Sequence, residues 1–284
     1  MTRVGVVGHV EWVDFAVVER VPHPGEIVHA RETFCAPGGG GAVAAVQLRK
    51  LAGDVTFLTA LGDDDTGRRA SEELRERYRV RSLHAARRPA AQRRTFTFLD
   101  DLGERTITVL GERIVPHLAD PLPWEQLASL DAIYLTGGDP GAVRAARAAR
   151  MLVATPRAMG ALATAGVQLD VLVRSSGDPG EAYEPGMLEP EPRVVVSTSG
   201  HAGGTWLLTG EPAPWIAGLS GSWQATPLPG PPVDAYGCGD SFAAALAYGL
   251  GAGLGLDEAI ALGARCGAAC RSGRGPYEGQ LELA

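Results

Sequence analysis

The sequence predicts an α/β protein with a central, mostly parallel β-sheet flanked by helices. Short runs rich in Val, Ile and Leu alternate along the chain with Ala-rich or amphipathic segments of helical length. Strands that alternate with helices form βαβ units, and these build parallel sheets. No linker divides the 284 residues, so we expect one domain spanning residues 1–284.

Each expected element rests on its residue pattern. The expected strands are short apolar runs, at residues 4–8, 55–60, 132–136, 171–173 and 194–197. The expected helices are richer in Ala, Leu and Arg, at residues 42–51, 67–77, 141–152, 241–251 and 257–270.

Two further segments, 27–35 and 95–109, have alternating patterns typical of strands. Residues 100–104 split the second segment and read as a hairpin turn. These strands, lying within about 12–37 and 93–111, form either a small separate sheet or an edge hairpin of the main sheet.

Composition restricts the class of protein. A net charge of −7 argues against nucleic-acid binding, and the arginines at 87, 88, 93 and 94 are interpreted as a solvated face. We find neither a signal pattern nor an apolar run of membrane-spanning length, so we expect no membrane partner and a cytoplasmic location. The four cysteines show no disulfide framework, and Cys266 and Cys270 suit one buried helix face better than a metal site.

Residues 234–242 contain the chemically most informative pattern, a glycine turn that runs into an Ala-rich helix. Gly237 and Gly239 lack Cβ atoms, so backbone N–H groups can converge there on an oxyanion, where the helix N-terminus also favours negative charge. Asp240 beside a transferring phosphoryl group could accept a proton from an attacking alcohol. The alternative is an ordinary Asp cap after a glycine turn.

Four motifs in order are similar to those of the ribokinase family, the PfkB-type sugar and nucleoside kinases. Asp-x-x-Gly-x-Gly-Asp-x-Phe at 234–242 resembles its second signature, and the glycine run with its helix at 38–53 resembles its first. Residues 61–67 resemble its Gly-x-Asp-x-x-Gly segment, and 198–204 its nucleotide-side turn. Together they extend from Val4 to about Pro276.

The resemblance implies a ribokinase-like fold in which the small sheet is a lid over the substrate. It also implies ATP-dependent phosphorylation of a hydroxyl on a sugar or polyol, with Mg²⁺ between the phosphates and Asp240 as base. The amides of Gly237, Cys238 and Gly239 would stabilise the transferring group. The nucleotide side would include the following residues: Thr198, Gly200, Gly203, Gly204, Gly273 and Pro276. Exposed edges of the lid strands make a homodimer one option and a monomer the other.

The acceptor side departs from the family pattern. Gly38, Gly39 and Gly40 match the first signature, but Val43 replaces the usual Asn that binds a sugar hydroxyl. The early acid that binds the substrate corresponds to Asp14 or to Glu11, both expected in the loop after the first strand. Either carboxylate could accept hydroxyl hydrogen bonds from a polyol.

The metal side departs as well. The family's Asn-x-x-Glu is replaced by a segment from Ser175 to Asp178, so Asp178 either holds a Mg²⁺-bound water or belongs to a simple turn. Several relatives hold a monovalent cation such as K⁺ near the position of Asp234. A nucleoside kinase and a catalytically weakened binding or regulatory relative remain alternative functions.

Overall fold

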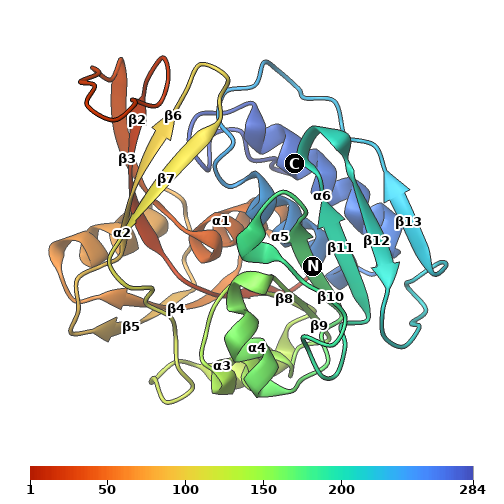
Figure 1. Ribbon diagram of the computed structural model, residues 1–284. Coiled ribbons are helices and arrows are strands. Elements are labelled where there is room, and N and C mark those ends of the chain that lie inside the picture. The colour runs from red at the N-terminus through yellow and green to blue at the C-terminus, as the bar shows by residue number, and fades with distance from the viewer. Residues whose placement is uncertain (284) are drawn as a thin grey trace.

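Nine strands form the large sheet, in the order β13-β12-β11-β10-β9-β8-β1-β4-β5. The structure is a computed structural model and describes residues 1–283. The strands are β1 (Val4–Val7), β4 (Thr56–Gly62), β5 (Leu83–Arg88), β8 (Ala132–Leu135), β9 (Met151–Ala154), β10 (Val171–Ser175), β11 (Val194–Thr198), β12 (Gly204–Leu208) and β13 (Ser220–Trp223). All neighbours from β5 to β11 pair in parallel, whereas β12 and β13 pair antiparallel at one edge (Figure 1).

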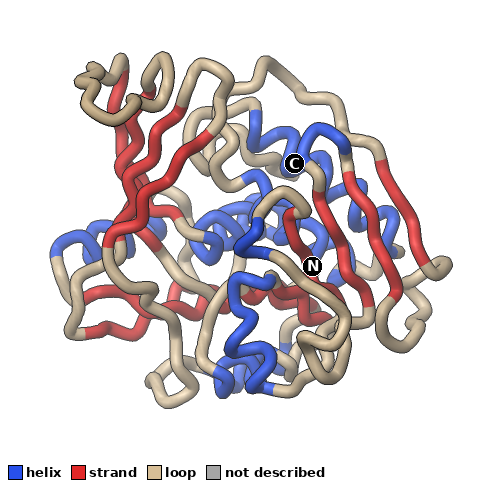
Figure 2. Tube along the Cα trace, viewed as in Figure 1, coloured by secondary structure: helices blue, strands red, loops and turns tan. Residues whose placement is uncertain are grey.

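Helices cover both faces of this sheet (Figure 2). The α-helices are α1 (Gly40–Ala52), α2 (Asp65–Glu76), α3 (Pro140–Ala146), α4 (Met159–Ala165), α5 (Cys238–Gly251) and α6 (Leu256–Arg271). The 3₁₀ turns are η1 (Trp124–Ser129), η2 (Pro156–Ala158), η3 (Pro179–Glu181) and η4 (Gly200–Ala202). Helices α1, α2, α5 and α6 share one apolar core, and α3 and α4 share another. Successive strand residues such as Val6 and Val7 point into opposite cores, as the alternation of side chains along a strand requires.

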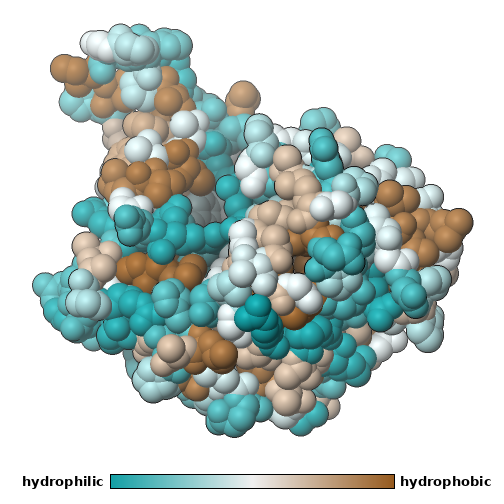
Figure 3. All heavy atoms as spheres, turned by 60° about the horizontal axis from the view of Figure 1, so that its bottom comes forward, coloured by the Kyte–Doolittle hydropathy of each residue, from teal (hydrophilic) through white to brown (hydrophobic). Residues whose placement is uncertain are grey.

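A separate four-stranded sheet projects from the body of the molecule, in the order β3-β2-β6-β7. Its strands are β2 (Glu11–Val17), β3 (Glu32–Gly38), β6 (Arg94–Leu99) and β7 (Arg105–Leu110). The predicted α/β class, the small separate sheet and the hairpin turn at 100–104 are thus confirmed. Figure 3 shows apolar surface on the projecting sheet, where β7 is exposed along its whole length and Ile107 and Val109 face solvent. The homodimer through these strands stays a prediction.

Three predicted elements were wrong in part. The helix expected at 141–152 ends at Ala146, because Met151 to Ala154 are completely buried and pair with β8 and β10, so sheet pairing overrides the helix propensity of the Ala/Arg run. The strand expected at 27–35 begins only at Glu32. Glu11 and Asp14 lie in β2 and not in a loop.

None of the helices within residues 1–283 combines the length and the apolar character needed to cross a bilayer.

The tip of the β6–β7 hairpin is docked on the segment that precedes α5. The amide of Ala235 donates to the carbonyl of Gly103 at 3.1 Å, and Arg105 Nη1 donates to the carbonyl of Ala235 at 3.0 Å. Arg271 holds the same tip through the carbonyl of Leu102 at 3.2 Å and the carboxylate of Glu104 at 2.8 Å. The small sheet is therefore connected directly to the glycine turn at the start of α5.

Replacing Gly103 by alanine should release this hairpin tip. Gly103 has φ +70°, and a Cβ atom there would lie 2.9 Å from the carbonyl oxygen of Val233. We expect faster amide hydrogen exchange at residues 100–105 and 233–236, because the tip must move away to relieve the contact. Gly111→Ala is the matched control, since Gly111 has φ +89° but its nearest neighbour lies 4.0 Å from the Cβ position. Equal exchange in the two variants would contradict the docking role.

Candidate active site

The glycine turn before α5 is held between α1 and the C-terminal loop. Gly237 has φ +83°, a conformation that favours glycine. A Cβ atom at Gly237 would lie 2.9 Å from Val43 Cγ1 and 3.4 Å from Pro276 Cβ, so the turn has no room for a side chain. The helix begins at Cys238, three residues before the expected start at 241, which places Gly239 and Asp240 in its first turn. Gly239 meets no other atoms around its Cβ position, so that side of the turn is open.

Asp234 shapes this turn from inside the protein. Its side chain is completely buried, and its two oxygens accept the amides of Tyr236 at 2.7 Å and Gly275 at 2.9 Å. Burial raises the pKa of Asp234, and these amides oppose that rise. The carboxylate thus joins the turn to the C-terminal loop. A monovalent cation near Asp234 stays a prediction.

Asp240 is half-buried and lies against the first glycine turn. Tyr134 Oη donates to Asp240 Oδ1 at 3.3 Å, and a Cβ atom at Gly40 would lie 2.8 Å from the same oxygen. Burial, and then the nearby negative charge of Glu181, raise the pKa of Asp240 to about 6, against the opposing effect of Tyr134 and two arginines. Such a carboxylate is ionised at neutral pH yet more basic than an exposed one, which suits a general base.

The pH dependence of turnover should report this carboxylate. Because a base acts in its deprotonated form, kcat/KM should rise about tenfold per pH unit at low pH and level off above a pKa of about 6. A steady-state pH profile with saturating nucleotide measures it. A flat profile down to the ordinary carboxylate range would contradict the role of Asp240.

Glu11 and not Asp14 lies beside the first glycine turn. Gly39 has φ +81°, and a Cβ atom there would lie 3.1 Å from Glu11 Cγ and from His9 Cδ2. Asp14 lies three residues further along β2, on the opposite face, where it pairs with Arg94 at 2.7 Å. Since side chains alternate along a strand, the geometry favours Glu11 as the acid on the acceptor side.

Val43 has no exposed surface. Its side chain packs under Gly237, and its carbonyl accepts a hydrogen bond from Gln280 at 3.0 Å. Val43 therefore packs against the glycine turn before α5 and offers no surface to a ligand. Gly38 ends β3, Gly39 caps α1, and Gly40 is the first residue of α1.

Three side chains around Glu11 were missed by the sequence analysis. Glu11 Oε1 lies 3.2 Å from His9 Nε2 and 3.1 Å from Arg93 Nε, and Arg113 Nη2 lies 2.7 Å from His9 Nδ1. The arginines at 93 and 88 are therefore not simply a solvated face, since Arg93 is 18% exposed and Arg88 is paired with Asp120 at 2.6 Å. Two features of the sequence could have pointed to these residues. His9 comes just after the first expected strand, and Arg93 comes just before the alternating run that forms β6.

Asp178 lies in a turn next to a second acid, Glu181, that the sequence analysis did not consider. Asp178 Oδ1 accepts the amide of Gly180 at 2.8 Å, so it caps η3. Glu181 accepts the amide of Ser175 at 2.8 Å, and Arg157 contacts both carboxylates. Glu181 lies near enough to raise the pKa of Asp240. The acid three residues beyond Asp178 was visible in the sequence as a candidate.

The geometry fits magnesium only as an ion held mainly by a nucleotide. No group of three His, Cys, Asp or Glu side chains in the described residues could hold a metal alone. Magnesium commonly keeps several waters and binds through one or two carboxylates together with substrate phosphates. Asp178 and Glu181 are the residues that could hold such waters.

The glycines expected on the nucleotide side differ in how closely neighbouring atoms approach them. A Cβ atom at Gly203 would lie 2.0 Å from the carbonyl oxygen of Trp223, and one at Gly204 would lie 2.3 Å from the Trp223 ring, so β13 requires both. Gly200, with φ +55°, faces open space. Ser176 Oγ lies 2.9 Å from Ser199 Oγ, which places the Asp178 loop beside the loop that follows Thr198.

The C-terminal loop around Gly273 and Pro276 is packed as tightly as Gly203 and Gly204 are against β13. A Cβ atom at Gly273 would lie 2.1 Å from the amide nitrogen of Gly279, and Pro276 contacts the Gly237 position. The roles of Gly273 and Pro276 in nucleotide binding stay predictions.

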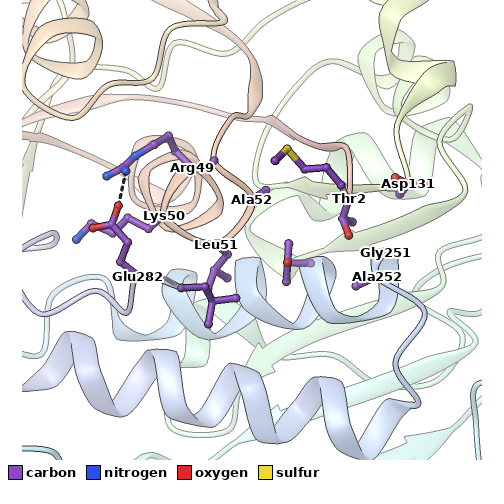
Figure 4. Close-up of a pocket in the computed structure, with 13 residues that line it drawn as sticks. Thr2, Arg49, Lys50, Leu51, Ala52, Asp131, Gly251, Ala252 and Glu282 are labelled. Carbon is purple, nitrogen blue, oxygen red and sulfur yellow. Dashed lines mark hydrogen bonds and ion pairs between the residues drawn. The ribbon is translucent and has the colours of Figure 1, made fainter.

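A recess of about 620 Å³ lies away from these residues (Figure 4). Thr2, Asp131 and Gly251 line it, together with Arg49 and Glu282, which form an ion pair at 2.7 Å. Thr2 and Asp131 precede β1 and β8, so this recess lies at the amino ends of parallel strands. The candidate site lies at their carboxyl ends, where ligands bind in open α/β sheets.

A comparison with known families shows the class of protein to which the chain belongs. The sequence matches the family described as pfkB family carbohydrate kinase over residues 1–179 and 180–282, so the chain belongs to that family. The resemblance found in the sequence is thereby confirmed.

Individual relatives are ribokinases. A ribokinase of Staphylococcus aureus (strain COL) is 30% identical over 110 residues, which span 38% of this chain and 36% of that protein. The ribokinase of Arabidopsis thaliana, solved with ribose and ATP, is 20% identical and covers 99% of this chain and 96% of that chain, with a TM-score of 0.72. The ribokinase of Thermotoga maritima is 21% identical and covers 99% and 97%, with a TM-score of 0.75. These solved structures confirm the ribokinase-like fold.

Proposed function

We propose that this protein transfers the γ-phosphoryl group of ATP to a hydroxyl group of a small sugar or related polyol. The observation that carries the proposal is the placement of Asp240. Its carboxylate lies in the first turn of α5, has its pKa raised to about 6, and faces Gly40 at the start of α1. A base between two glycine turns can reach an acceptor on one side and a phosphate on the other.

In the proposed reaction, Asp240 takes the proton of the acceptor hydroxyl as its oxygen bonds to the γ-phosphorus. The bond from that phosphorus to the bridging oxygen breaks, and ADP leaves. The amides of Gly237, Cys238 and Gly239 donate to the transferring group at the N-terminus of α5. Bound Mg²⁺ would neutralise charge between the phosphates, with Asp178 and Glu181 holding its waters.

The remaining residues would bind and enclose the reactants. Glu11, rather than Asp14, would bind the acceptor beside Gly39. The small sheet would act as a lid that excludes water, which limits hydrolysis of ATP. Thr198 and Gly200 would contact the nucleotide. We also propose that residues 1–284 form a single catalytic domain.

The test is ATP turnover with a panel of neutral sugars, polyols, sugar acids, sugar phosphates and nucleosides. We expect ADP release that depends on both Mg²⁺ and one class of acceptor, and a product one phosphoryl group heavier by mass spectrometry. Binding of an acceptor with no transfer by the wild-type protein would instead indicate a regulatory relative. Preferred turnover of nucleosides would replace the sugar assignment.

A further inference from the structure

A basic cluster lies on the acceptor side of the site, made of His9, Glu11, Arg93 and Arg113. His9 follows β1, Glu11 begins β2, and Arg93 precedes β6. Arg113 follows β7, so the cluster lies where the small sheet joins the large one. These four residues come from three separate stretches of the chain and meet beside Gly39.

Positive charge exceeds negative charge in this cluster. Burial, and then Arg113, lower the pKa of His9 to about 4, so His9 is neutral at physiological pH. The cluster therefore holds two guanidinium groups and one carboxylate, Glu11, which pairs with Arg93 and acts on Arg113 through its charge. Burial, and then the charge of Arg93, lower the pKa of Arg113 to about 10, as expected where buried positive charge lacks a sufficient counter-charge.

The cluster also has unused hydrogen-bond donors. Among the described residues, Arg93 Nε is buried and makes no hydrogen bond, although it lies 3.1 Å from Glu11 Oε1 as an ion pair. Arg113 Nε is likewise buried without an acceptor. Glu11 Oε1 lies beside both His9 Nε2 and Arg93 Nε, so this carboxylate helps to orient the arginine. Buried charged donors without acceptors are costly, and a bound anion would satisfy them.

The position of Arg93 is fixed by a motif. Asp64 Oδ2 accepts the amide of Gln92 at 2.9 Å, and Gln92 Oε1 accepts the amide of Gly62 at 2.9 Å. Gln92 Nε2 also donates to the carbonyl of Val10 at 2.8 Å. The Gly-x-Asp-x-x-Gly segment thus holds the residue next to Arg93, while Val10 links it to the strand of Glu11.

The cluster lies within reach of one small molecule that also contacts Asp240. Arg113 Nη2 donates to the carbonyl of Thr136 at 2.8 Å. Thr136 Cβ lies 3.3 Å from the Cβ position of Gly40, and that position lies 2.8 Å from Asp240 Oδ1. The negative charge of Asp240 also acts on Arg113.

We propose that the acceptor is an anionic polyol, whose oxyanion is bound by Arg93 and Arg113 while one of its hydroxyl groups faces Asp240. This inference rests on the proposed kinase function and names its substrate class. The oxyanion is the carboxylate of a sugar acid or the phosphate of a sugar phosphate. Planar guanidinium groups bind both in a bidentate manner.

The test compares matched acceptors of equal carbon number: an aldonic acid, the corresponding aldose, the alditol and the sugar phosphate. We expect the wild-type protein to prefer one of the two anionic acceptors. Preference for the aldonic acid would indicate a carboxylate site, and preference for the sugar phosphate would indicate a phosphate site. In Arg93→Gln and Arg113→Gln, KM for that anion should rise about 10- to 100-fold, because a hydrogen bond to a charged group is lost.

Arg94→Gln is the matched control, because Arg94 is adjacent to Arg93 but pairs with Asp14 on the other side of the sheet. Arg113→Lys should restore part of the affinity if charge is what matters. Calorimetric binding of the anion to the wild-type and variant proteins gives a readout independent of turnover.

The outcomes separate the two proposals. If neutral sugars are phosphorylated best and both glutamine variants keep the wild-type KM, the anionic class is wrong and the kinase function stands. If anions bind through these arginines without phosphorylation, the substrate class survives as a ligand class and the kinase function fails. If no acceptor is bound or phosphorylated, both are wrong.

Discussion

Asp240→Asn should lower kcat by about 10²- to 10⁴-fold, the range expected for loss of a general base. The amide keeps the shape of the carboxylate but cannot accept the proton of the acceptor hydroxyl. KM for both substrates should change little, because Asp240 Oδ1 contacts Tyr134 and the Gly40 position and is not needed to hold ATP. Steady-state kinetics with the preferred acceptor measures this loss.

The same variant should be more stable than the wild-type protein at pH 8. The pKa of Asp240 is raised from 3.8 to about 6, so the native state binds this proton more tightly than the unfolded state. The charged form therefore destabilises the fold progressively as pH rises through this window, and fully above it. Removing the charge should raise Tm at pH 8, which distinguishes a chemical defect from unfolding.

Asp65→Asn is the control for Asp240→Asn. Asp65 also lies in the first turn of a helix, but its side chain is 98% exposed and forms only a surface pair with Arg68. Such pairs contribute little, so activity and Tm should stay near wild type. Wild-type kcat in Asp240→Asn would mean that the base lies elsewhere.

Gly40→Ala should lower kcat by about 10²-fold, because misplacement of a catalytic group by about 1 Å has an effect of this size. The added methyl group would lie 2.8 Å from Asp240 Oδ1 and 3.3 Å from Thr136 Cβ. Alanine is otherwise favourable in a helix, so helix propensity would act in the opposite direction. Kinetics of the single variants and of the Gly40→Ala, Asp240→Asn double variant measure the effect.

The double variant makes this prediction specific. If the methyl group acts by displacing Asp240, it should cause little further loss once Asp240 is already asparagine. Gly160→Ala is the matched control, since Gly160 lies in the first turn of α4 and nothing lies within 4 Å of its Cβ position. Additive losses in the double variant would show that Gly40 acts through another group.

Local sequence patterns were sufficient to predict those elements whose structure depends on neighbouring residues in the chain. Helix α5 was predictable from its Ala-rich run, although it begins at Cys238 and not at 241. The β6–β7 hairpin was predictable because a turn divides an alternating run. The end of α3 was not, because Met151 to Ala154 become a strand only through pairing with β8 and β10. Strand β2 was missed because both of its faces carry apolar residues, Val13 and Phe15 on one and Trp12 and Ala16 on the other. Its sequence therefore lacks the alternation of apolar and polar residues that marks a strand.

The side chains of the site depend even more on packing. The sequence presented Glu11 and Asp14 as equal candidates, and only the direction of β2 distinguishes them. The distance along the chain hid the contacts of His9 with Arg113, and of Asp240 with Tyr134. Long-range contacts of this kind follow from the order of strands in the sheet, which no local motif specifies.

The docked hairpin tip has a thermodynamic consequence. Both polar backbone atoms of Ala235 are bonded to the small sheet, through Gly103 and Arg105, and Ala235 lies two residues before Gly237. A displacement of the sheet is therefore energetically linked to a displacement of the turn that we propose binds an oxyanion. Linkage is reciprocal, so under this proposal a ligand that stabilises the docked sheet strengthens phosphate binding at the turn by the same factor that phosphate strengthens the binding of that ligand.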